Sequence, residues 1–210
     1  MHARDQLPVL LIDMGGCFFS YSFTGALQAW AGAAGQDPDQ LLARWQIDGP
    51  FDAFERGEIP PASYLQHLRH LLGLELTDTQ MAAGWNAIYG TADTDLIQLL
   101  STPTVRTRFH RIAGVSNTNT LHARHWRDLF REQLPVLDAV HCSHEVGATK
   151  PQRAFFDHVA AVYGTTRDHL VLVDDIHEVT AAADALGLRA HHYQGAAGLA
   201  SYLNTLSPSN

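Results

Sequence analysis

The apolar residues of this chain fall into two patterns. Residues 8–13 form a continuous apolar run that ends in an acid, which is typical of a buried parallel strand. From about residue 23 to residue 90 the apolar positions recur at helical spacing, and no strand pattern interrupts them. We expect helices in this stretch at 23–34, 39–45, 62–72 and 78–89. Thr77 is placed to cap the last of them.

After residue 91 the pattern alternates between helix and strand. We expect helices at 93–101, 120–131, 151–163, 178–186 and 196–205, and strands at 111–116, 139–143, 170–174 and 189–193. This alternation predicts an α/β fold, a Rossmann-like parallel sheet sandwiched by helices with right-handed crossovers. The helical stretch then becomes an insertion after the first strand. The expected division is a core domain of residues 1–20 and 91–210 and a helical domain of residues 21–90.

Composition and charge narrow the classes of partner. The 210 residues are 46% hydrophobic, which is ordinary for a soluble globular protein, and the formal net charge is −8. This charge, without any basic run, argues against nucleic acid or an anionic membrane as a partner. No apolar run approaches the roughly 20 residues that cross a bilayer, and the first one is too short for a signal peptide. We therefore expect a cytoplasmic protein. The oligomeric state stays open.

Four short segments carry the candidate chemistry, and each follows or flanks an apolar run. They are Asp13 with Gly15-Gly16, Ser116-Asn117, Lys150-Pro151 and Asp174-Asp175. Because parallel strands end at one edge of a sheet, these segments can meet there. A carboxylate nucleophile, a hydroxyl, a lysine and an acidic pair together suit a phosphoryl group and a magnesium ion.

Each residue of this set also has a purely structural interpretation. Asp13 could cap a turn, and Asp174 and Asp175 could form a solvated turn, although two adjacent acids repel each other unless a cation or a proton intervenes. Lys150 could be a surface residue, but a lysine at a helix start is unfavourable to the helix dipole. Ser116 and Asn117 could supply a hydroxyl and a backbone N–H to phosphate oxygens.

Competing motifs are weaker. The segment from Gly114 to Thr118 lacks the second glycine of a serine-hydrolase elbow. Histidine pairs at zinc-compatible spacing occur without an HExxH motif; they are His67/His70, His122/His125 and His141/His144. Neither a GxGxxG nor a P-loop motif is present. Cys17 and Cys142 lie in apolar contexts, where buried unreactive thiols are expected.

The four segments resemble, in order and spacing, the motifs of the haloacid dehalogenase (HAD) superfamily. The resemblance covers almost the whole chain, including the helical insertion, which in this family is a cap over the active site. The segment IleAspMetGlyGly at 12–16 is similar to the first motif of a dehalogenase-like subgroup with DxGG or DxGN, whose bacterial members include glucose-1-phosphate phosphatases. The segments at 54–59, 84–88, 115–119, 147–151 and 173–178 resemble that subgroup too.

The resemblance implies a role for each candidate. Asp13 would be the nucleophile, and Lys150 would offset charge on Asp13 and on the phosphate. Magnesium would be the cofactor, and a small phosphorylated molecule the substrate. The implied metal ligands are Asp13, the backbone carbonyl of Gly15, Asp175, and Asp174 through water. The implied phosphate-binding residues are Ser116, Asn117 and Lys150. Glu178 would support the metal site, and Trp45, Arg56 and Trp85 are candidates for substrate contacts in the cap.

Two departures from the family pattern bear on activity. Most HAD phosphatases carry an Asp two positions after the nucleophile, as general acid and then base, and Gly15 stands there. A group of this kind contributes about 10²–10⁴ in rate. The subgroup shares this gap, and it should favour substrates with easier leaving groups. Val179 stands where many relatives have Asn, which weakens support for the metal.

Three hypotheses follow. The first is a magnesium-dependent phosphatase of small phosphorylated metabolites, of the sugar-phosphate type, that acts through an aspartyl-phosphate on Asp13. The second is a catalytically weak or inactive protein that binds a phosphorylated ligand or partner, which Gly15 and Val179 motivate. The third is a 2-haloacid dehalogenase, in which Asp13 attacks carbon; it leaves the acidic pair Asp174-Asp175 poorly explained because dehalogenases need no metal.

Overall fold

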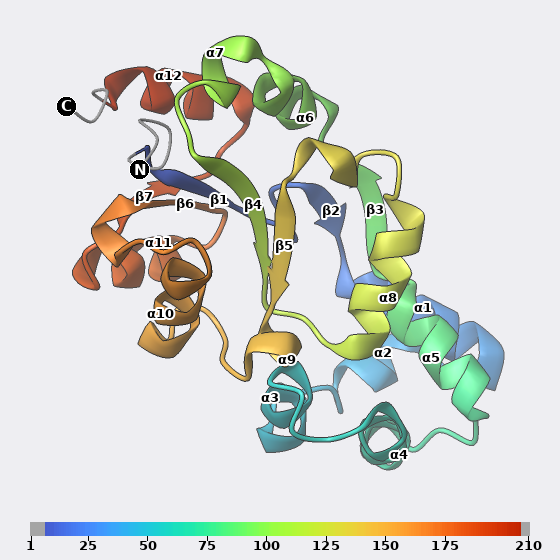
Figure 1. The fold of residues 1–210 in the computed structure, drawn as a ribbon. Coiled ribbons are helices and arrows are strands. Elements are labelled where there is room, and N and C mark those ends of the chain that lie inside the picture. The colour runs from blue at the N-terminus through green and yellow to red at the C-terminus, as the bar shows by residue number, and fades with distance from the viewer. Residues whose placement is uncertain (1–6, 207–210) are drawn as a thin grey trace.

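Five parallel strands form the central sheet of the computed structural model, which describes residues 7–206. Their order across the sheet is β5-β4-β1-β6-β7 (Figure 1). The bounds are β1 Val9–Asp13, β4 Arg111–Ser116, β5 Ala139–Cys142, β6 Leu170–Asp174 and β7 Arg189–His192. All residues of β1 and β6 are buried, as expected for strands covered on both faces. The predicted α/β fold class is confirmed.

Successive residues of β1 face opposite layers. Leu10 and Ile12 belong to a core shared with helices on one face of the sheet, whereas Val9 and Leu11 belong to the core on the other face. The first face is covered by α6 Thr94–Ser101, α7 Pro103–Arg106, α8 Thr120–Leu129 and α12 Ala196–Thr205. The second is covered by α10 Arg153–Val162 and α11 His177–Ala185. This two-sided burial holds β1 at the centre and fixes where its last residue points.

The inserted helices have a hydrophobic core of their own. We call them the helical cap; they are α1 Phe23–Ala34, α2 Pro38–Leu42, α3 Gly49–Glu55, α4 Pro61–Leu72 and α5 Asp78–Asn86. Trp30 and Trp85 stack at its centre with ring centroids 6.1 Å apart. Within the helical cap, α5 packs against α8, whereas α3 packs against α9 Ser143–Val146 (Figure 1).

A small antiparallel sheet joins the helical cap to the central sheet, and the sequence pattern did not predict it. Its strands are β2 Phe19–Tyr21 and β3 Tyr89–Ala92. The helix expected at 78–89 therefore ends at Asn86, and the helical stretch does not run to residue 90. Packing explains the strands: the ring of Phe19 stacks on Phe130 at 4.7 Å and meets Tyr89 edge-on at 5.3 Å. These contacts are distant in the sequence.

Other differences are local. The expected helix 39–45 is the short α2, capped by the Asp37 side chain, which accepts a hydrogen bond from Asp39 N. Helix α3 was not expected, because Gly49-Pro50 was interpreted as a break; Pro at the start of a helix is favourable. Short elements also missed are α9 Ser143–Val146 and the 3₁₀ turns at Leu134–Val136 and Arg167–His169. Within residues 7–206, no helix is both long and apolar enough to span a membrane.

Candidate active site

The ends of three neighbouring strands bring the predicted residues together. Asp13 is the last residue of β1 and pairs in register with Val115, so Ser116 follows one position further along β4. Asp174 ends β6 on the other side of β1. All three side chains are buried. The strand ends thus place a carboxylate, a hydroxyl and a second carboxylate along one edge of the sheet.

Lys150 joins the two carboxylates. Its Nζ donates to Asp13 Oδ1 at 2.5 Å and to Asp174 Oδ2 at 2.7 Å. It is the only lysine in the chain, whose other fixed cations are arginines, and it is 5% exposed. Burial by itself would lower the pKa of Lys150, but the two carboxylates outweigh burial and hold the pKa above its usual value. A compact ammonium with three donors can bind both carboxylates and keep a third donor for a substrate oxygen.

The side chain of Asn117 holds Lys150 in place. Asn117 Oδ1 accepts from the backbone N–H of Lys150 at 2.7 Å, and Asn117 Nδ2 donates to the Lys150 carbonyl at 2.8 Å. Pro151 was expected to begin the helix, but α10 begins at Arg153, after a cis Lys150-Pro151 peptide bond. The reason is that Asn117 holds the Lys150 backbone in a loop. Asn117 therefore uses its side chain to position Lys150, which leaves its predicted backbone contact with phosphate as a prediction.

The electrostatics of the site call for more positive charge. Burial raises the pKa of Asp13 to about 7, Lys150 acts against this shift, and Asp174 adds to it. Burial and the neighbouring Asp174 also raise the pKa of Asp175. One ammonium faces three carboxylates here. A divalent cation is the group that would restore the balance and keep Asp13 ionised as a nucleophile.

The residues around Asp175 fit a metal ion. Ligand atoms of Asp13, Asp175 and Cys17 lie within 4.8 Å of one another, the one such group among residues 7–206. Asp175 Oδ1 is buried and has no hydrogen-bond partner among the described residues. A Cβ at Gly16, whose φ is +84°, would lie 2.1 Å from Asp175 Oδ2, so only glycine leaves room for that carboxylate. Burial raises the pKa of the Cys17 thiol and keeps it neutral, which leaves oxygen ligands of the kind magnesium prefers.

Asp174 and Asp175 have different surroundings although they are adjacent. Asp174 is bound by Lys150, and its Oδ1 accepts from the backbone N–H of Ile176 at 3.0 Å. Asp175 instead belongs to the group with Asp13 and Cys17. The direct role of Asp175 and the indirect role of Asp174 in binding a metal stay predictions. The carbonyl of Gly15 stays a prediction; Gly15 lines the same cavity as Asp13.

A cavity of about 380 Å³ lies between this edge of the sheet and the helical cap. From the sheet edge it is lined by Asp13, Gly15, Ser116, Asn117, Thr118, Lys150, Asp174, Ile176 and Val179. Of the predicted cap residues, Trp45 and Trp85 line it, whereas Arg56 pairs with Glu58 at 2.6 Å and is not among its lining residues. Glu178 is exposed in the first turn of α11 and also lies outside the lining. The roles suggested for Arg56 and Glu178 stay predictions.

Sequence reasoning assigned no role to Tyr21 and Glu55, which are polar and line the cavity. Tyr21 comes from β2 and Glu55 from the end of α3. Glu55 belongs to the quoted segment 54–59, so a signal was present, but no chemistry was assigned to it. Nothing in the sequence pattern pointed to Tyr21, because β2 itself was not expected.

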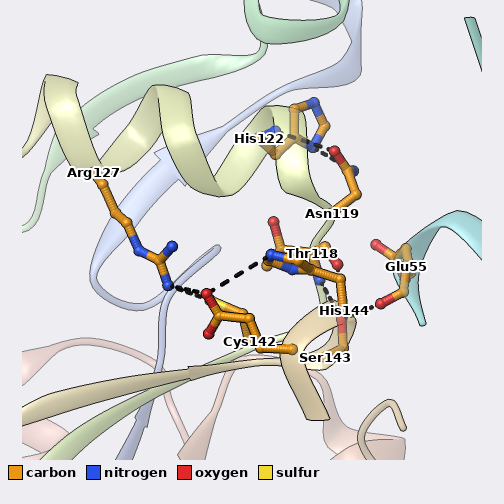
Figure 2. A network of polar contacts seen from close by, with 9 residues as sticks. Glu55, Thr118, Asn119, His122, Arg127, Cys142, Ser143 and His144 are labelled. Atoms are coloured by element: carbon orange, nitrogen blue, oxygen red, sulfur yellow. Dashed lines mark hydrogen bonds and ion pairs between the residues drawn. The ribbon is translucent and has the colours of Figure 1, made fainter. Parts of the chain in front are cut away.

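Hydrogen bonds fasten the helical cap to the sheet at two places. Figure 2 shows the first: Ser143 Oγ lies 2.6 Å from the Glu55 carbonyl and 2.8 Å from both the carbonyl and the N–H of Thr118. In the second, His122 Nε2 lies 2.8 Å from the Trp85 carbonyl, and the His122 and Trp85 rings stack at 4.6 Å. The cap residues of the cavity are thus held in register with the loop that follows β4.

The alternative metal and thiol motifs are not assembled. Within the described part of the chain, none of the histidine pairs belongs to a group of three metal-ligand side chains. Cys17 and Cys142 are free and buried, as predicted.

Comparison with known proteins identifies the fold. No protein-family model matches the sequence. A HAD family enzyme from Bacteroides thetaiotaomicron, solved in complex with magnesium and inorganic phosphate, is similar with 23% identity and a TM-score of 0.74, over 90% of this chain and 95% of that one. A predicted HAD-like family hydrolase from Porphyromonas gingivalis is similar with 18% identity and a TM-score of 0.76, over 96% and 99% of the two chains.

A structure of L-2-haloacid dehalogenase from Xanthobacter autotrophicus is also similar, with 18% identity and a TM-score of 0.64 over 97% of this chain and 85% of that one. The chain therefore has the fold of HAD enzymes, and the resemblance predicted from the four motifs is confirmed at the level of the fold. At these identities the fold does not separate a phosphatase from a dehalogenase, so the chemistry has to come from the site.

Proposed function

We propose that this protein is a magnesium-dependent phosphatase of small phosphorylated metabolites that acts through an aspartyl-phosphate on Asp13. The observation that carries the proposal is the position of Lys150, bound to both Asp13 and Asp174, beside Asp175, whose Oδ1 is buried without a hydrogen-bond partner among the described residues. The HAD family enzyme from Bacteroides thetaiotaomicron was solved with magnesium and phosphate, which supports the same chemistry here.

In the first half-reaction a carboxylate oxygen of Asp13 attacks phosphorus, and the bond from phosphorus to the leaving oxygen breaks. The third donor of Lys150 and the hydroxyl of Ser116 bind the phosphoryl oxygens. The Asn117 side chain holds Lys150 in position through two hydrogen bonds to the Lys150 backbone. In the second half-reaction water attacks phosphorus, and the Asp13 carboxylate leaves with the electron pair of its P–O bond.

Asp13 and Asp175 are the side chains that would hold magnesium, with Asp174 beside them. When bound, the ion supplies positive charge that stabilises the phosphoryl group in the transition state. The rest of the catalysis is positioning: buried residues hold the nucleophile and the ammonium at fixed distances, and the helical cap restricts the access of bulk water.

The lining of the cavity favours a substrate whose only charged group is a single phosphate. Lys150 is the one lysine or arginine among its lining residues. His122 also lines it, but burial lowers the pKa of His122 to about 4, so that ring carries no charge near neutral pH. Aromatic rings make up much of the wall, namely Phe19, Tyr21, Phe23, Trp45, Phe51, Trp85 and Tyr89. A sugar monophosphate of modest size matches this combination better than a bisphosphate.

The dehalogenase alternative draws on the similarity to the Xanthobacter autotrophicus enzyme. The buried oxygen of Asp175 favours the phosphatase, because a metal-free reaction leaves that atom without a partner. The inactive alternative rests on Gly15, which removes the usual acid from the first motif.

The test is phosphate release from a panel of sugar monophosphates in magnesium, for the protein and for Asp13→Asn. We expect turnover that depends on both Asp13 and magnesium. Calorimetry gives a second readout, in which magnesium binds the protein and binds Asp175→Asn at least tenfold more weakly. Equal phosphate release by the protein and Asp13→Asn would contradict the proposal, and halide release from 2-chloropropionate in EDTA would support the dehalogenase instead.

A further inference from the structure

The proposed reaction lacks a proton donor for the leaving oxygen. Gly15 has no side chain, and Lys150 is already bound to Asp13 and Asp174. An alkoxide is a poor leaving group, so a sugar phosphate needs a positioned acid at this step. The cavity contains one carboxyl group that does not come from the sheet edge: that of Glu55.

Glu55 reaches the cavity from the helical cap. It is the last residue of α3 and lines the same cavity as Asp13 and Lys150. Among residues 7–206, its carboxyl group has no hydrogen-bond or ion-pair partner. The Asp37 and Asp48 carboxylates elsewhere in the cap accept hydrogen bonds that start helices, so Glu55 is unlike them in having no structural task.

The backbone of Glu55 is fixed although its side chain is unpartnered. Its carbonyl accepts from Ser143 Oγ, which is also bonded to Thr118 in the loop that follows Ser116 and Asn117 (Figure 2). Two residues later, a Cβ at Gly57 would lie 2.4 Å from the His144 carbonyl, so only glycine permits this close approach of the cap to α9. These contacts fix the Cα of Glu55 relative to the phosphate-binding loop.

The surroundings of Glu55 suit proton transfer near neutral pH. Burial raises the pKa of Glu55 to about 7, Asp52 on the same helix adds to the shift, and Lys150 opposes it. The other groups that face it are the phenols of Tyr21, Tyr64 and Tyr89, from β2, α4 and β3. Burial raises the pKa of Tyr21 above its usual value, which makes this phenol a weaker acid than Glu55.

We propose that Glu55, supplied by the helical cap, is the general acid and base that replaces the missing carboxyl group at position 15. This inference rests on the proposed phosphatase function. As Asp13 attacks phosphorus and the bond to the leaving oxygen breaks, the Glu55 carboxylic acid gives its proton to that oxygen, and an alcohol departs. As water then attacks the aspartyl-phosphate, the Glu55 carboxylate takes a proton from that water, inorganic phosphate departs, and both residues return to their starting states.

The experiment compares Glu55→Gln with the unaltered protein on two substrates in magnesium. Glucose 6-phosphate or another alkyl phosphate needs the acid, whereas p-nitrophenyl phosphate has a leaving group stable enough to depart without it. We expect kcat/KM for the alkyl phosphate to fall by about 10²–10⁴ and that for p-nitrophenyl phosphate to fall much less. With p-nitrophenyl phosphate, the phosphorylated form of Glu55→Gln should accumulate, because its hydrolysis lacks the base.

Glu58→Gln is the matched control, since Glu58 lies on the same segment but is exposed and pairs with Arg56. It should behave like the unaltered protein on both substrates. Glu55→Asp keeps the carboxyl group but shortens the side chain, so its kcat/KM for the alkyl phosphate should lie between those of the unaltered protein and Glu55→Gln. It replaces Glu55→Gln in the experiment if that variant does not fold. Equal losses on both substrates without accumulation of phosphoenzyme would overturn the inference. If turnover is independent of Asp13 in all these proteins, the proposed function fails instead.

Discussion

The ring of Tyr21 lies against Gly15, with its Cε1 atom 3.1 Å from the point that a Cβ at position 15 would occupy. The position of the missing acid is therefore covered by an aromatic side chain from β2. Tyr21 is 50% exposed and lines the cavity together with Gly15.

This contact predicts a coupling between positions 15 and 21. Gly15→Ala should destabilise the protein, because the added methyl group crowds the Tyr21 ring. In a Tyr21→Ala background the same substitution should be neutral or stabilising by about 0.4–1 kcal/mol, since alanine reduces the freedom of the unfolded chain. Urea unfolding of the four proteins measures the coupling, which we expect to exceed about 0.5 kcal/mol. If the effects of the two substitutions on the free energy of unfolding were additive, the Tyr21 ring would not be crowded by the added methyl group.

Removal of the Lys150 ammonium should affect both stability and turnover. Lys150→Met leaves Asp13 and Asp174 buried without their counter-charge, and we expect a loss of about 3–5 kcal/mol in the free energy of unfolding. Chemical denaturation measures the stability, and phosphate release should become undetectable. Arg153→Met is the control: Arg153 is exposed and pairs with Asp157, so its loss should cost less than about 1 kcal/mol. A Lys150→Met protein as stable as the control would contradict the electrostatic account.

Ser143 should matter for the attachment of the helical cap. Ser143→Ala removes the hydrogen bonds to Glu55 and Thr118 and leaves buried backbone groups without a partner, at a cost of about 1–3 kcal/mol. Hydrogen exchange should show faster exchange at the end of α3 and in the loop after β4. Ser101→Ala, which removes an exposed bond to the Ile97 carbonyl, should change neither region. If Ser143→Ala exchanged no faster than Ser101→Ala at the end of α3 and in the loop after β4, Ser143 would not join the helical cap to that loop.

His122 predicts a contribution to stability that depends on pH. Burial lowers its pKa from 6.5 to about 4, so the unfolded chain binds a proton more readily than the folded protein. The contribution of His122 is therefore fully present above pH 6.5 and is lost as the pH falls towards 4. Asp13 and Glu55, with raised pKa values, shift stability in the opposite direction, so a variant is needed to isolate His122.

The comparison uses unfolding free energies of the protein and of His122→Gln between pH 7 and pH 4. The advantage of the unaltered protein should shrink over this range, by up to about 1.4 kcal/mol per unit of pH. A difference that stays constant would show that His122 does not titrate as its burial predicts.

The sequence predicted the parts of the site that depend on strand ends. Asp13, Ser116 and Asp174 could be placed because each follows an apolar run long enough to be a buried strand, and parallel strands end together. Lys150 could be suspected, but its two ion pairs depend on Asn117, and a side chain that clamps a backbone segment 33 residues away leaves no periodic signal.

The cap side of the site could not be predicted in the same way. Strands β2 and β3 have only three and four residues, too few for an alternating pattern, and they form because Phe19 packs against Phe130. Tyr21 is positioned by the pairing of β2 with β3. Glu55 faces the cavity because Ser143 and Gly57 set how closely α3 approaches α9, which is a tertiary relationship.

The central claim is that Asp13 carries the phosphoryl group during turnover. The most direct measurement is acid quenching of the protein during hydrolysis of p-nitrophenyl phosphate in magnesium, followed by mass spectrometry of its peptides. The account predicts a phosphoryl group on the peptide that contains Asp13 and none on Asp13→Asn. Turnover without phosphorylation of Asp13, or a phosphoryl group on another residue, would contradict it.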